Sequence, residues 1–227
     1  MLPIIRSIFV SAHLYISTAK AAFIADLTDR QMNRVVDEQL IPNPLVVQQG
    51  NSRWFTLLGA AFAKFYFSAE DLLVASARRQ VLAELTARVA REKKRDEILA
   101  LRMADSVSWK VHFQFVSVDV QPFIHAALDR AREVAQAEAL VATDAEVMGG
   151  TPVFAGSRVP LDVILSSLAK GIALERLKMS YPFLTEVHIQ AAEVYMNVHP
   201  PRGRPRRLAE LNPDLPRRSG MTYAKQK

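Results

Sequence analysis

The chain of 227 residues contains no cysteine, and this absence removes two classes of site at once. Without thiols it can form neither a disulfide framework nor a thiolate metal site, which fits a reducing compartment. The five histidines also lack the spacing of metal ligands, because they are scattered as His13, His112, His125, His188 and His199. We therefore expect no bound metal.

Glycine is scarce as well, with eight in the chain, and none of them forms the glycine-rich phosphate loop of nucleotide-binding enzymes. Carboxylates of the kind that a metal-dependent nuclease uses are spread along the sequence, as Asp105, Asp119, Asp129 and Asp144. We expect that the protein is not an enzyme, has no catalytic residues and needs no cofactor.

Long apolar runs are absent too. No segment reaches the roughly 20 consecutive apolar residues that a membrane-spanning helix needs. The apolar residues 1–22 are interrupted by Arg6 and diluted by polar side chains, unlike the unbroken core of a secretory signal. We expect a cytoplasmic protein with no membrane partner.

The net charge of +6 is concentrated at the C-terminus. Residues 200–227 contain eight of the 29 basic and two of the 23 acidic residues, so charges balance over the rest of the chain. A basic segment with Pro and Gly stays extended until an acidic partner binds it. We treat residues 200–227 as a flexible basic tail.

Residues 17–41 have the pattern of two short helices joined by a tight turn. Thr28 and Gln31 are spaced as a capping box at the start of the second helix. Helical spacing turns Met32 and Val35 inward and leaves polar side chains outward. Arg, Gln and Asn can form paired hydrogen bonds with base edges in the major groove. The predicted base-reading residues are Arg30, Gln31, Asn33 and Arg34.

A β-hairpin is predicted directly after these helices. It comprises the apolar run 45–47, a turn at 50–51 and a second strand that contains Arg53. Arg53 is placed to contact a phosphate. Residues 15–67 resemble the winged helix-turn-helix of MerR-type regulators, and we assign residues 1–68 to this DNA-binding domain. Charges nearly cancel over 15–67, so the alternative is a structural helical hairpin that packs on the rest of the protein.

Residues 69–104 are predicted to be one connecting helix. Apolar residues from Leu73 to Val89 recur every four positions, which indicates a packing or dimer seam, and arginines such as Arg78 are expected on the solvated face. Residues 107–115 then alternate strictly, which predicts a half-buried strand. A helix follows over 122–140.

The stretch 148–200 carries the most specific pattern. Turn signals at 149–150 and 155–156 flank a short apolar run, whose Val153 and Phe154 we expect to pair with the strand at 107–115. Pro160 opens a helix and Gly171 ends it. Further helices are predicted at 174–180 and 185–197, which makes a compact three-helix module.

This pattern resembles the small module known as domain of unknown function 433, found in VapB-type antitoxins. The whole chain is then expected to be mainly α with small β elements: residues 105–199 hold a strand–helix segment and the three-helix antitoxin module, with its core at 145–199. The last helix contains no Lys or Arg, so phosphate is not attracted to it. We interpret the module as a platform for protein interaction and dimerisation.

The resemblance also implies a role for the tail. In VapB-type antitoxins such a tail lies across a PIN-like ribonuclease toxin, and arginine suits its acidic metal-binding site because the guanidinium pairs with carboxylates. Leucines three and four residues apart add an apolar anchor. The predicted toxin-binding residues are Arg202, Arg204, Arg206, Arg207, Leu208, Leu211, Leu215, Arg217 and Arg218.

Other interpretations of the tail remain open. Residues 201–205 match the core of an AT-hook, which inserts Arg-Gly-Arg into an A·T-rich minor groove, and an inert solubilising tail is the third possibility. We expect an antitoxin that forms a homodimer on operator DNA, represses its own operon, and builds a heterotetramer or larger complex with its toxin. The alternative is a freestanding MerR-like transcription regulator.

Overall fold

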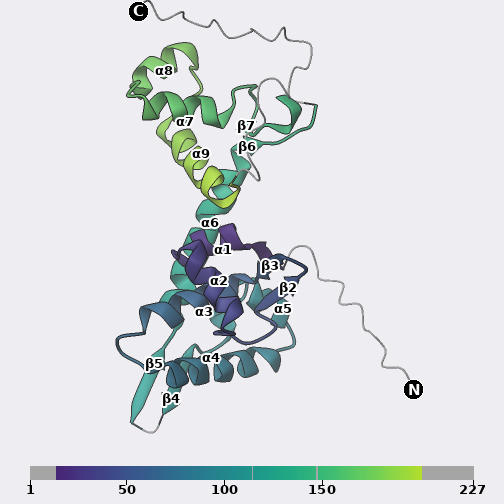
Figure 1. Ribbon diagram of the computed structural model, residues 1–227, viewed down its shortest axis with the longest axis vertical. Coiled ribbons are helices and arrows are strands. Elements are labelled where there is room, and N and C mark those ends of the chain that lie inside the picture. Colours follow the sequence, from purple (N-terminus) through teal and green to yellow (C-terminus); the bar gives the residue numbers. More distant parts are fainter. Residues whose placement is uncertain (1–13, 114, 147, 201–227) are drawn as a thin grey trace, which may run out of the picture.

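The computed structural model has two lobes joined by a narrow waist (Figure 1). It describes residues 14–113, 115–146 and 148–200. The described chain is mainly helical, with three small sheets, as the sequence predicts.

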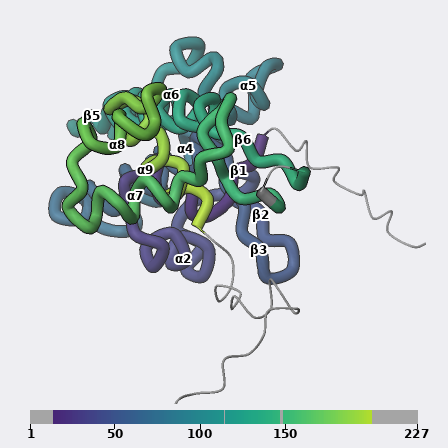
Figure 2. The backbone as a smooth tube through the Cα atoms, turned by 90° about the horizontal axis from the view of Figure 1, so that it is seen from above, coloured from purple at the N-terminus to yellow at the C-terminus, as the bar shows by residue number. Residues whose placement is uncertain are grey.

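The lower lobe begins with the predicted helix pair and hairpin. A three-stranded antiparallel sheet has the order β1-β3-β2, with Phe55 opposite both Ile16 and Val46. In both views the hairpin lies beside α2 (Figures 1 and 2). The elements are β1 (Ile16–Ser17), α1 (Thr18–Ala25), α2 (Asp29–Asp37), β2 (Val46–Gln49) and β3 (Ser52–Phe55).

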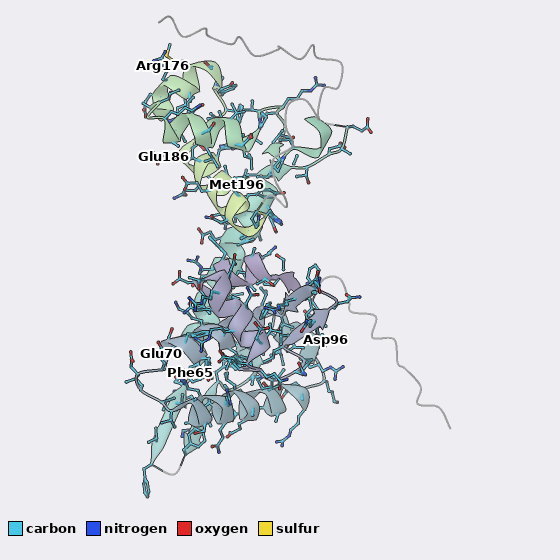
Figure 3. The ribbon with its side chains drawn as sticks, viewed as in Figure 1. Phe65, Glu70, Asp96, Arg176, Glu186 and Met196 are labelled. Atoms are coloured by element: carbon cyan, nitrogen blue, oxygen red, sulfur yellow. The ribbon has the colours of Figure 1, made fainter. Side chains whose placement is uncertain are left out.

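The core of this lobe is built around α3, which is buried over most of its length. Phe62 packs edge-to-face on Trp109, with ring centroids 6.2 Å apart, and Phe65, labelled in Figure 3, packs on Phe123 at 5.6 Å. The remaining elements are α3 (Leu57–Ser68), α4 (Ala75–Ala90), α5 (Arg95–Leu99), the 3₁₀ turn Ala104–Ser106, β4 (Lys110–Phe113) and β5 (Val116–Asp119).

The single connecting helix predicted over 69–104 is wrong, because the structure has two helices there, α4 and α5. Residues 91–96 are all charged and exposed, so no apolar face continues the stripe of α4. The stripe itself is an internal packing seam, since Val81, Leu85 and Val89 are buried in the lower core.

Arg78 was expected on the solvated face of this helix and is instead buried. Its guanidinium carbon lies 4.2 Å from the centroid of the Tyr66 ring, and Nη1 donates a hydrogen bond to the Tyr66 carbonyl oxygen. The aromatic face and the backbone carbonyl of Tyr66 together compensate for the desolvation of the buried Arg78 guanidinium.

The predicted pairing of Val153 and Phe154 with the strand near 107–115 is also wrong. That strand, β4, forms a hairpin with β5, whereas β7 (Val153–Phe154) pairs with β6 (Val141–Ala142). The reason is distance, because the 19-residue helix α6 (Gln121–Ala139) carries the chain about 28 Å away from β4 before β6 begins.

The upper lobe contains the three-helix module, and its helices lie where the sequence predicts them: α7 (Leu161–Ala169), α8 (Leu174–Ser180) and α9 (Glu186–Val198). Gly171 ends α7 with a φ of +84°. α9 runs from the upper lobe to the waist, as the labels on Glu186 and Met196 show in Figure 3. Its Ala192 belongs to the upper core and its Val194 and Val198 to the lower core, so α9 ties the lobes together.

None of the helices in the described ranges combines the length and the apolar character needed to cross a membrane.

Candidate functional site

The turn between α1 and α2 is fixed by Asp26 and Lys64. Asp26 adopts a left-handed conformation with φ of +50°, and Lys64 Nζ donates hydrogen bonds to its Oδ2 at 3.0 Å and its carbonyl oxygen at 3.2 Å. The hydrogen bond and the charge of Lys64 lower the pKa of Asp26. A lysine from α3 therefore sets the angle at which α2 leaves α1.

The start of α2 carries the capping box that the sequence predicts. Thr28 Oγ1 accepts a hydrogen bond from the Gln31 backbone N–H at 3.2 Å, and Gln31 Oε1 accepts one from the Thr28 N–H at 3.0 Å. The capping box therefore occupies the amide oxygen of Gln31, which a pair of hydrogen bonds to adenine would also require. If Gln31 reads a base, the box has to open, and such a cap contributes about 1 kcal/mol.

Two arginines of α2 face solvent. Arg34 Nε donates to Glu38 Oε1 at 2.8 Å, and its guanidinium carbon lies 5.6 Å from the centroid of the Phe67 ring. The hydrogen bond from Arg34 lowers the pKa of Glu38, although desolvation acts in the opposite direction. Exposed pairs of this spacing are weak, so Arg34 is easily released for another anion. Arg30 is exposed and has no ion pair or side-chain hydrogen bond with the described residues.

Arg53 points back onto α2. Its Nη1 donates to Asn33 Oδ1 and its Nη2 to Asp37 Oδ1, both at 2.6 Å. The guanidinium therefore ties the hairpin to α2, and a phosphate contact requires it to leave Asp37. Asn33 likewise has its amide oxygen in use.

The five predicted DNA-binding residues lie on α2 and β3, and Arg53 joins these two elements through Asn33 and Asp37. Charge on the surface of α2 and β3 is mixed, because Asp29, Asp37 and Glu38 offset the arginines. Attraction to phosphate from this surface alone is therefore small.

A groove of about 1150 Å³ lies next to these residues. Three segments that are distant in sequence form its walls, namely the start of α1, the β2–β3 hairpin and the end of α9, and Asp29 and Asn33 add the edge of α2. The chain passes from His199 and Pro200 at its rim into residues 201–227. The groove therefore connects the candidate DNA surface with the origin of the basic tail.

One wall of the groove holds an ionic cluster that joins α1, α6 and the end of α9. Lys20 Nζ lies 2.7 and 2.9 Å from the two carboxylate oxygens of Glu138, and His199 Nε2 lies 2.9 Å from Glu138 Oε1. Burial raises the pKa of Glu138, but the hydrogen bonds and charges of Lys20 and His199 outweigh it and lower the pKa overall. Sequence reasoning missed this cluster, since 118 residues separate Lys20 from Glu138.

The upper lobe has an aromatic core. Phe154, Phe183 and His188 contact one another edge-to-face, with ring centroids 5.7 to 6.0 Å apart. His188 Nδ1 also lies 2.8 Å from Thr185 Oγ1, so this half-buried imidazole packs against the edge of the upper core and contacts the exposed Thr185. Within the described ranges no three His, Asp or Glu side chains gather to hold a metal ion.

The nine residues predicted to bind toxin, from Arg202 to Arg218, lie outside the described residues.

Comparison with known proteins places this chain in a family. Residues 141–196, which include β6, β7 and the three-helix module, match the family described as "Protein of unknown function (DUF433)". The chain is 30% identical over 196 residues to the "Uncharacterized protein y4eO" of Sinorhizobium fredii, and the match covers 86% of each chain. No solved structure matches the chain. The chain thus belongs to the family of the Sinorhizobium fredii protein y4eO and contains a DUF433 segment.

Proposed function

We propose that the protein is a DNA-binding antitoxin of a type II toxin–antitoxin system, which represses its own operon and inhibits a PIN-like ribonuclease toxin in the cytoplasm. The observation that carries the proposal is the combination of a capped helix–turn–helix, an adjacent hairpin and a DUF433 segment in one chain. The resemblance of that segment to VapB-type antitoxins supplies the toxin class.

DNA binding would follow the geometry of a MerR-like winged helix-turn-helix. α2 enters the major groove with Arg30 and Arg34 toward the base edges, and the β2–β3 hairpin follows the neighbouring phosphates. The Arg53 bonds to α2 support this mode because they hold helix and hairpin as one unit. Since the surface charge is mixed, a second copy supplies the remaining phosphate attraction.

Fluorescence anisotropy with the DNA upstream of the protein's own gene tests this part. Arg30→Ala is expected to weaken binding by about 1–3 kcal/mol and to relax sequence preference. Arg176→Ala is the matched control, since Arg176 is an exposed arginine of α8 at the far end of the upper lobe (Figure 3). Equal affinities of the two variants would contradict the assignment of α2.

Toxin binding is assigned to the tail, with the DUF433 segment as the platform that presents it. Arginines of residues 200–227 pair with the carboxylates of the toxin's metal-binding site, while the leucines anchor the segment. The complex is a heterotetramer or larger, built on an antitoxin homodimer.

A second function is favoured by the position of the tail's origin. Because His199 and Pro200 line the same groove as α1 and the hairpin, the tail starts beside the proposed DNA surface. This arrangement suits a freestanding regulator whose AT-hook-like residues 201–205 enter the minor groove. Removing the tail from such a regulator lowers the salt dependence of DNA binding by about one unit for each phosphate that the tail neutralises. A tail devoted to a toxin leaves the salt dependence unchanged.

A further inference from the structure

We propose that the outer edge of β5 is the surface through which two copies of this chain form a dimer. β4 and β5 make a two-stranded sheet that projects from the lower end of the molecule (Figure 1). The proposal rests on the homodimer named above and identifies its interface, which involves none of the predicted DNA-binding residues.

The register of β4 and β5 shows which backbone N–H and C=O groups of β5 make no hydrogen bond to β4. Val111 pairs with Val118 and Phe113 with Val116, and the Trp109 carbonyl oxygen accepts a hydrogen bond from the Val120 N–H at 3.0 Å. Since bonded and non-bonded pairs alternate along an antiparallel ladder, the N–H and C=O groups of the intervening β5 residues, 117 and 119, point away from β4. Nothing in the described chain pairs with that edge.

The opposite edge of this sheet is partly occupied. Arg88 Nη1, from α4, donates hydrogen bonds to the carbonyl oxygens of Ser108 and Lys110, the latter at 3.1 Å. The Lys110 carbonyl belongs to the outward-facing set of β4, so the arginine occupies part of that edge. Part of the β4 edge is therefore covered by a side chain, whereas no strand of the described chain covers the β5 edge, and open edges invite association.

Apolar side chains surround the open edge. Phe115 is 97% exposed and Val116 is 55% exposed. The loop between α3 and α4, with Leu72 84% and Val74 71% exposed, lies on the same side of the lower lobe (Figures 1 and 2). Four strand residues alone fall short of the roughly 1,200 Å² that a stable interface buries, and this neighbouring apolar surface extends the area.

The strand is complementary to a second copy of itself. A twofold axis beside Ser117 pairs β5 with its mate in antiparallel fashion, so Val116 of each copy lies opposite Val118 of the other. The negative charge of Asp119 does not oppose this pairing, because Asp119 then lies opposite position 115 of the second copy and not opposite another Asp119. Its carboxylate is also neutralised within its own chain by Lys110 Nζ at 3.4 Å.

Sedimentation velocity of the full chain tests the proposal, and the wild type is expected at twice 25.4 kDa. Ser117→Pro removes an outward N–H that the hairpin does not use, and proline is tolerated at sheet edges. It should raise the dimer dissociation constant at least about tenfold, whereas the control Ser117→Thr keeps the N–H and should stay dimeric. Val116→Lys places two ammonium groups near the axis and should also dissociate the dimer.

A monomeric wild type, or a Val116→Lys variant as dimeric as the wild type, overturns the proposal. Circular dichroism confirms that each variant is folded, and Val116→Lys decides the outcome if Ser117→Pro fails to fold. A monomer that still binds operator DNA or toxin would overturn this interface alone. A β5-dependent dimer that binds neither would overturn the proposed function and leave the interface standing.

Discussion

Replacing Glu138 by Gln is expected to loosen the junction between the two lobes. The Glu138 carboxylate accepts two hydrogen bonds from Lys20 on α1 and one contact from His199 at the end of α9. The amide of Gln keeps the shape of the side chain and one acceptor oxygen but loses the negative charge. Lys20 then loses its charged partner in a site where its side chain is only 22% exposed.

The size of the effect follows from the partial burial of the cluster. Fully exposed ion pairs contribute about 0.2–1 kcal/mol, and hydrogen bonds to charged groups contribute about 1.5–3 kcal/mol when buried. The Glu138 side chain is 32% exposed, so its contribution to stability is expected to lie between the exposed and the buried case. We expect the free energy of unfolding to fall by about 1–2 kcal/mol, and for a chain of this size the Tm to fall by about 2–8 °C.

The pH dependence has a definite sign. A carboxyl whose pKa is lowered in the folded state stabilises the fold above its unfolded pKa, and loses this effect as pH falls through its folded pKa. Burial raises the pKa of Glu138, but Lys20 and His199 lower it below its ordinary value of 4.5. The stability gap between wild type and Glu138→Gln should therefore be complete at neutral pH and close as pH falls below 4.5.

Urea denaturation at a series of pH values measures this gap. Glu133→Gln is the matched control, because Glu133 is an exposed carboxylate of the same helix with no ion pair among the described residues. If Glu138→Gln is no less stable than Glu133→Gln at neutral pH, or if the gap widens in acid, the charge of Glu138 does not stabilise the junction.

Substitutions at three further positions test the candidate DNA surface and its support. Thr28→Ala removes the capping hydroxyl of α2 and should cost about 0.5–2 kcal/mol in urea denaturation, with Thr28→Ser close to wild type. Arg53→Met should weaken operator binding in anisotropy by separating the hairpin from α2. Arg53→Lys keeps the charge but not the paired bonds, so an affinity equal to wild type would mean that charge alone matters at this position. Gly59→Ala brings a Cβ within 2.6 Å of the Leu45 carbonyl oxygen and should lower stability by about 1–3 kcal/mol, and an unchanged Tm would contradict this.

Features that depend on neighbouring residues could be predicted from the sequence. The Thr28–Gln31 capping box, the helix end at Gly171 and the three helices of the upper lobe each rest on a short pattern, and the structure confirms them. Such signals act within a few residues, so tertiary context seldom changes them.

Features that depend on distant partners could not be predicted. The contacts of Arg53 with α2 and of Lys20 with Glu138 form only when the chain folds. Arg53, which is expected from the sequence to meet a phosphate, is therefore paired with α2 within the protein. The burial of Arg78 has the same origin, because its aromatic partner Tyr66 comes from another helix. The alternation at 107–115 predicted a strand, and β4 forms within that stretch, but the expected partner was wrong because β5, and not Val153 and Phe154, pairs with it.

Co-purification with the product of the neighbouring gene tests whether the protein is an antitoxin. The tagged full-length chain is compared with a chain that ends at Pro200 and with a full-length variant in which the four arginines from 202 to 207 are replaced by serine. We expect that the full chain captures a small acidic ribonuclease and inhibits it, and that both altered chains lose inhibition. Capture of no neighbouring product by the full chain would contradict the antitoxin assignment and favour the freestanding regulator.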